Sequence, residues 1–203
     1  MTRRDVGPLR ELDTLVDQFA GKEARKKIMK GIDDMGKASP EKLAEWLAGV
    51  MDNLDALADQ ETRTQIMVNC GRNCAHMNKS HIERTVGKRK KFESLDEFLK
   101  SEEKKPAKGT RLVRKEGVIY QVYTPSSFRK GLRCFCSLWR GLPTDATVSQ
   151  TWCFCSKGFV QTLWEAVTEG PVEVELLESC ISGAEECTFA IHLKNTEANH
   201  GTT

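Results

Sequence analysis

A short phrase built around two cysteines occurs twice in this chain, nineteen residues apart. The copies read RCFCS over 133–137 and WCFCS over 152–156, and they hold four of the eight cysteines. In an extended strand, side chains two residues apart point to the same side. The phrase therefore predicts two paired strands that bring four sulfurs together on one face. The sulfurs belong to Cys134, Cys136, Cys153 and Cys155.

Two further cysteines, Cys70 and Cys74, lie four residues apart in a stretch that predicts a helix from Glu61 onward. This spacing puts both thiols on one face of a helix. We expect the pair to close over the other four thiols and to link the two halves of the chain. Structural zinc sites and cubane iron–sulfur clusters each take four thiolate ligands. The six cysteines therefore predict a metal site whose cofactor is zinc or an iron–sulfur cluster.

Six thiols exceed one four-ligand site, and the sequence leaves several arrangements open. A site with two spare thiols, a site that shares ligands from both halves and a multinuclear centre all fit, and His76 is an alternative to one thiolate. The competing interpretation is that the thiols are buried small apolar side chains or form a thiol–disulfide pair. Cys180 and Cys187 are interpreted as packing thiols, and no catalytic residue can be named.

Charge and hydropathy argue against nucleic-acid and membrane partners. The net charge is +2, and the basic run over 88–91 has no aromatic residues among its cations, so we expect no nucleic-acid partner. The apolar runs are too short for a membrane span, and the first residues lack the apolar stretch of a secretory signal. We therefore expect a cytoplasmic protein without a membrane partner, in which thiols stay reduced.

The sequence changes from helical to strand-like patterns at the polar stretch 101–109, SEEKKPAKG. Residues 1–105 carry apolar side chains at three-four spacing and predict a helical N-terminal region. Residues 108–195 predict an α+β domain, and a polar tail over 196–203 follows. The elements expected in that domain are a hairpin over 112–123, a helix over 157–168 and strands over 172–176 and 187–193. The predicted fold class is α+β: a helical N-terminal half, then an antiparallel sheet with a covering helix.

The order of motifs after residue 150 resembles a known superfamily. A cysteine-containing stretch precedes a helix that ends in Gly170-Pro171-Val172, and then come a Val-x-Val strand and a hairpin from Ser179 to Phe189. This order resembles the 4-vinyl reductase-like superfamily and the related L-2-amino-thiazoline-4-carboxylate hydrolase-like group. With the Cys70 segment, the chain is similar to an uncharacterised cysteine-rich branch. The resemblance implies that fold over about residues 110–195, and small-molecule sensing of the kind found in that superfamily.

The resemblance also implies a zinc site in one part of the superfamily. Members that sense aromatic compounds bind zinc through a Glu and cysteines near the final hairpin, where this chain has Glu178, Cys180 and Cys187. The spacing Glu178-x-Cys180 is shorter here than in that pattern.

Three functions follow as hypotheses. The first is a metal-binding protein with a small-molecule-binding α+β domain. The second is a thiol-dependent hydrolase of a sulfur-containing heterocycle, as the relatives' name implies, with a reactive cysteine beside Arg72 or Arg133. The third is a sensor or interaction module without metal, whose apolar cavity lies between helix 157–168 and the sheet. A homodimer is compatible with all three.

Overall fold

The protein begins with a layer of helices. The computed structural model describes residues 7–194, so the predicted polar tail over 196–203 and the first six residues lie outside the described part. The helices of this layer are α1 (Gly7–Ala20), α2 (Lys22–Ile28), α3 (Pro40–Leu57) and α4 (Gln60–Met77). Two further helices, α5 (Lys79–Arg89) and α6 (Leu95–Lys104), contact helix α8 (Phe154–Thr168) and strand β1 (Thr110–Lys115) instead. Ser39, Asp59 and Ser94 cap the starts of α3, α4 and α6 by accepting a backbone N–H with their side chains.

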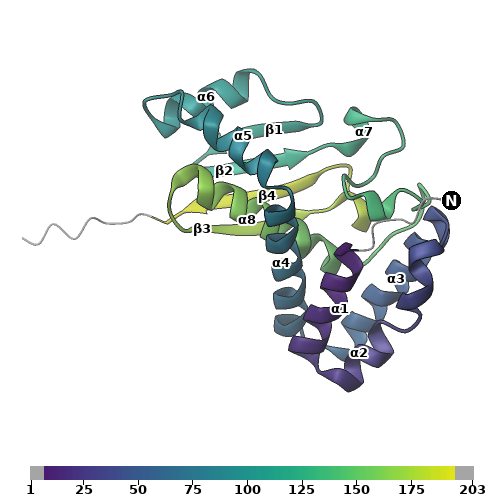
Figure 1. Ribbon diagram of the computed structural model, residues 1–203. Coiled ribbons are helices and arrows are strands. Elements are labelled where there is room, and N and C mark those ends of the chain that lie inside the picture. The colour runs from purple at the N-terminus through teal and green to yellow at the C-terminus, as the bar shows by residue number, and fades with distance from the viewer. Residues whose placement is uncertain (1–6, 195–203) are drawn as a thin grey trace, which may run out of the picture.

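A four-stranded antiparallel sheet follows the helices (Figure 1). The strands β1 (Thr110–Lys115), β2 (Val118–Tyr123), β3 (Val172–Glu178) and β4 (Cys187–Leu193) take the order β1-β2-β4-β3. The expected hairpin over 112–123 is confirmed, and Glu116 and Gly117 turn it with positive φ angles of 53° and 80°. The predicted class, α+β with a helical N-terminal part, is therefore also confirmed.

Helix α8 (Phe154–Thr168) covers one face of the sheet. Val160, Leu163 and Trp164 of α8 are buried in one cluster with strand residues such as Val174 and Phe189. Glu173 and Glu175 point to the opposite side of β3 and are exposed, as their alternation with valines predicts.

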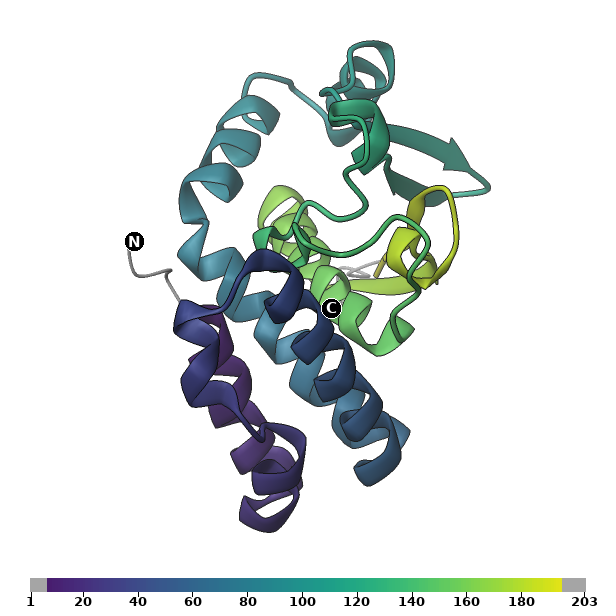
Figure 2. The same cartoon turned by 90° about the vertical axis from the view of Figure 1, so that its right-hand side faces the viewer.

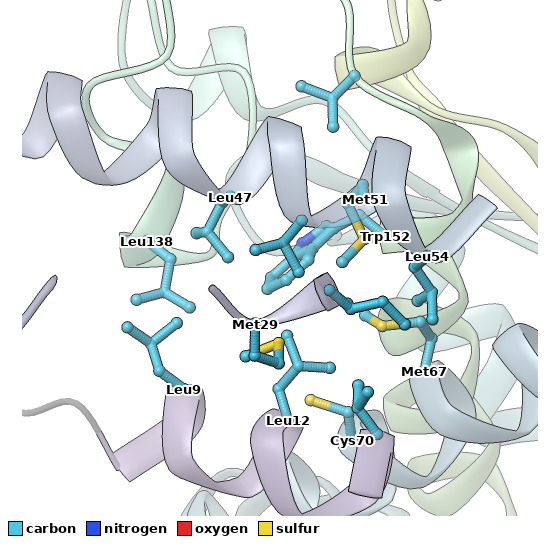
Figure 3. Close-up of a cluster of buried hydrophobic side chains, with 14 of the residues drawn as sticks. Leu9, Leu12, Met29, Leu47, Met51, Leu54, Met67, Cys70, Leu138 and Trp152 are labelled. Atoms are coloured by element: carbon cyan, nitrogen blue, oxygen red, sulfur yellow. The ribbon is translucent and has the colours of Figure 1, made fainter. Parts of the chain in front are cut away.

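A second apolar cluster joins the helical layer to the segment before α8. Leu12 of α1, Leu47 of α3 and Met67 of α4 meet Leu138 and Trp152 in this cluster (Figure 3). The segment over 129–149 contains a 3₁₀ turn, Ser137–Trp139, and crosses between the sheet and α3 (Figure 2). Asp55 of α3 fixes its end by accepting hydrogen bonds from the hydroxyls of Ser149 and Thr151.

The expectation that the two Cys-Phe-Cys phrases form paired strands is wrong. Cys134 and Cys136 lie in the segment before the 3₁₀ turn, and Cys153 directly precedes α8, whose second residue is Cys155. The apolar helical pattern of α8 extends back to Phe154, so the second phrase joins the helix. In the first phrase, Phe135 packs edge-on against Tyr123 and Phe128 instead of alternating along a strand.

Candidate functional site

The cysteines gather where α4, the 129–149 segment, the start of α8 and the last hairpin meet. All eight lie within residues 7–194 and are free thiols there. Their mutual interactions divide them into two adjacent groups. The hairpin group consists of Cys134, Cys153, Cys180 and Cys187. The helix group consists of Cys70, Cys74, Cys136 and Cys155.

This arrangement differs from the single four-sulfur face expected from the doubled phrase. Each Cys-x-Cys phrase contributes one thiol to each group, so Cys134 and Cys153 belong to one group and Cys136 and Cys155 to the other. The groups touch, because Cys136 also interacts with Cys134 and Cys153. The six cysteines named from the sequence are therefore all brought together, but in two sets that are completed by Cys180 and Cys187.

The hairpin group is centred on the turn that leads into β4. The Cys180 thiol donates to the carbonyl oxygen of Glu185 at 3.2 Å, and the backbone N–H of Cys180 donates to the Cys187 sulfur at 3.3 Å. The interaction between the two side chains lowers the pKa of Cys187 and raises that of Cys180. Burial raises the pKa of Cys153 to about 12 and that of Cys134 well above its ordinary value.

Two other sulfurs of the hairpin group also have polar partners. The backbone N–H of Cys136 donates to the Cys134 sulfur at 3.4 Å, and the Ser179 hydroxyl lies 2.8 Å from the Cys153 sulfur. Ser179 is only 2% exposed. Hydrogen bonds to sulfur stabilise a thiolate and tune the metal that it binds. Cys134 and Cys187 thus accept a backbone N–H, which suits the charged form of a thiol, and Cys153 shares a hydrogen bond with Ser179 in which either side chain can donate.

Ion pairs and carbonyl contacts fix the backbone around the hairpin group. Glu186, next to Cys187, accepts two hydrogen bonds from Arg111 at 2.6 and 2.7 Å and one from Thr124 at 2.8 Å. The Arg133 guanidinium donates to the carbonyl oxygens of Pro143, Ala146 and Cys180. The turn and the 129–149 segment are therefore tied together independently of the thiols.

The helix group lies at the contact between α4 and α8. Cys70 and Cys155 share a side-chain hydrogen bond, which lowers the pKa of Cys70 and raises that of Cys155 well above its ordinary value. Cys74 lies one turn after Cys70, as the helical spacing predicts, and burial raises its pKa. Burial also raises the pKa of Cys136 to about 11. Figure 3 shows Cys70 near Leu12 and Met67, at the margin of the apolar cluster.

The thiols of each group are not arranged around a common point as metal ligands would be. Among residues 7–194, no three or more His, Cys, Asp or Glu side chains are placed so that they could hold a metal ion as they stand. Each group instead consists of one interacting pair of thiols with two further thiols beside it. A metal would have to draw the sulfurs of a group together.

Other residues named from the sequence lie elsewhere. His76 is exposed on α4. Glu178 is exposed, and its carboxylate accepts a hydrogen bond from Thr188 at 3.3 Å. Arg72 pairs with Glu165 at 3.9 Å, and Arg133 is held by carbonyls, so both guanidinium groups have partners other than a thiol.

The third hypothesis from the sequence places a ligand cavity between helix 157–168 and the sheet. The contact between α8 and the sheet is filled by buried apolar side chains. A hollow of about 160 Å³ lies instead between the ends of α5 and α8, lined by Val86, Arg89 and Ala166 among others. Typical small-molecule pockets measure about 300–1,000 Å³.

In the described part of the chain, no helix is long and apolar enough to cross a membrane.

Comparisons with known proteins place the chain in a family. A search of the curated proteins found no match. One similar solved structure is described as "Crystal structure of an H-NOX protein from S. oneidensis in the Fe(II)NO ligation state"; it is 13% identical, with a TM-score of 0.43, over 93% of this chain and 98% of that one. So distant a likeness carries no argument about ligand or activity. The model of a "Family of unknown function (DUF6144)" matches residues 10–198, and the chain belongs to that family.

Proposed function

We propose that the protein binds a soft metal through the hairpin group, with Cys134, Cys153, Cys180 and Cys187 as its ligands. The observation that carries this proposal is that thiols from three separate parts of the chain converge on one turn and three of their sulfurs have polar partners. Thiolate ligands favour zinc or an iron–sulfur cluster over magnesium or calcium.

Simple packing accounts poorly for this arrangement. A buried cysteine that serves as a small apolar side chain needs no hydrogen-bond donor. Here a buried serine hydroxyl and two backbone N–H groups are directed at sulfur. Four thiolates in one place repel one another and raise each other's pKa, and a cation removes that repulsion.

The resemblance to 4-vinyl reductase-like proteins supports the same location and stays a prediction. In that resemblance a Glu completes a zinc site near the last hairpin. In this chain Glu178 bonds Thr188, and Cys134 lies beside the other three thiols. We therefore expect a site made of sulfur ligands alone. Small-molecule sensing and hydrolysis of a heterocycle likewise stay predictions.

The test is the metal content of the protein purified without oxygen. We expect zinc, or iron with matching sulfide, at no less than one site per chain by elemental analysis. Cys187→Ser should lose this metal, because one of four ligands is replaced. Thr188→Ala, at the adjacent position of β4, should keep it. A folded, reduced protein that takes up neither zinc nor iron with sulfide would refute the proposal.

A further inference from the structure

We propose that the helix group, Cys70, Cys74, Cys136 and Cys155, is a second soft-metal site, so that the protein holds two metal centres side by side. This inference goes beyond the proposed function, because it rests on other ligands and on another pair of elements. Its ligands come from α4, from the 129–149 segment and from α8.

The packing of α4 against α8 is unusually close at this group. A Cβ atom added to Gly71 would lie 1.8 Å from the carbonyl oxygen of Cys155, and one added to Gly158 would lie 2.1 Å from that of Val68. Glycine at both positions lets the two backbones touch. The close approach places Cys70, beside Gly71, directly opposite Cys155, and the two thiols bond each other there.

The remaining two ligands lie around that pair. Cys74 follows Cys70 by one helical turn, and Cys136 interacts with both of them. The side-chain amide of Asn78 donates to the Cys74 sulfur at 3.6 Å, which provides this thiol with a donor suited to its charged form. Cys74, Cys136 and Cys155 are all half-buried, so a metal can reach this group from solvent.

The doubled Cys-x-Cys phrase fits two centres better than one. In each phrase the first cysteine joins the hairpin group and the second joins the helix group. Two residues therefore reach neighbouring sites from one short stretch of backbone, and this occurs twice. Eight thiols in two sets of four satisfy two four-ligand centres with no cysteine left over.

Counting bound metal in matched variants tests the second site. Reduced wild-type protein titrated with Zn(II) should bind two ions per chain by native mass spectrometry, and with Co(II) it should show the visible bands of tetrahedral thiolate coordination. Cys74→Ser should bind one, and Cys187→Ser should also bind one. His76→Ala, on the exposed side of the same turn as Cys74, should still bind two.

The outcomes separate the second site from the first. Wild-type protein that binds one ion, lost in Cys187→Ser and kept in Cys74→Ser, would overturn the second site and leave the proposed function standing. One ion lost only in Cys74→Ser would overturn the proposed function instead. Should Cys74→Ser fail to fold, alkylation of the wild type decides: zinc should protect Cys70, Cys74, Cys136 and Cys155 together. Labelling of these four that is unchanged by zinc would refute the second site.

Discussion

At the scale of single residues, the buried hydroxyl of Ser179 provides a test of the proposed metal site. Ser179 precedes Cys180 and lies 2.8 Å from the Cys153 sulfur, which comes from another element. Removing such an outer partner of a ligand costs about 10–100-fold in metal affinity. We expect Ser179→Ala to weaken zinc binding at the hairpin group by that factor and to leave the helix group unchanged, measured by competition with a chromophoric chelator. Equal weakening of both groups would indicate a general loss of structure.

Arg114 provides a test of how pH acts on the fold away from the thiols. Its guanidinium donates to Glu103 at 2.8 Å, which lowers the pKa of that carboxyl group, and it also donates to Asp96, whose pKa Lys100 and then Arg114 lower. A lowered carboxyl pKa stabilises the fold above the unfolded value, near 4, and that contribution disappears as the pH falls through the folded value. Arg114→Gln should therefore melt below the wild type at pH 7, and the gap should narrow below about pH 4. Lys115→Gln, next to it and exposed, should show no such convergence in thermal melts.

At the scale of elements, the contact between α4 and α8 depends on two glycines. Gly71→Ala or Gly158→Ala would push a methyl group into the facing backbone, so the helices must separate. Overpacking of this kind costs about 1–3 kcal/mol, and sometimes more. Gly49→Ala in α3 is the matched control, because nothing lies within 4 Å of its added Cβ, and it should stabilise the protein by about 0.5–1 kcal/mol. Urea denaturation would measure all three, and a stable Gly71→Ala would show that the helices are not held this closely.

The elements also show what the sequence could predict and why. The hairpin predicted over 112–123 and strand β4 follow from local turn residues and alternation, and the sequence also predicts helix α4 from Glu61 onward. The alternation in a phrase as short as Cys-Phe-Cys does not distinguish a strand from the first turn of a helix, and the apolar pattern of α8 decided the second copy. Cys180 and Cys187 gave one local signal, a pair of thiols flanking a Gly-containing turn. The division into two groups depends on how α4 packs against α8, which no local pattern contains.

At the scale of the whole molecule, the two thiol groups join parts of the chain that are far apart in sequence. The helix group connects α4 with α8, the hairpin group connects the last turn with the start of α8, and the 129–149 segment supplies one ligand to each. This segment has little regular structure of its own. Metal bound to both groups would therefore hold the helical layer, the segment and the sheet in one arrangement.

Limited proteolysis measures that effect directly. Arg140 is exposed in the 129–149 segment, between the two cysteines of the first phrase and those of the second, so trypsin can test whether the segment opens. At free zinc about 100-fold above its dissociation constant, one site adds about 2.7 kcal/mol, which suppresses any opening that breaks the site about 100-fold. We expect zinc to slow cleavage after Arg140 strongly and to leave cleavage after the exposed Lys108 unchanged, because Lys108 precedes β1 and lies outside both groups. Equal slowing at both positions would mean that zinc acts on trypsin, and no slowing at Arg140 would show that the segment is not held by metal.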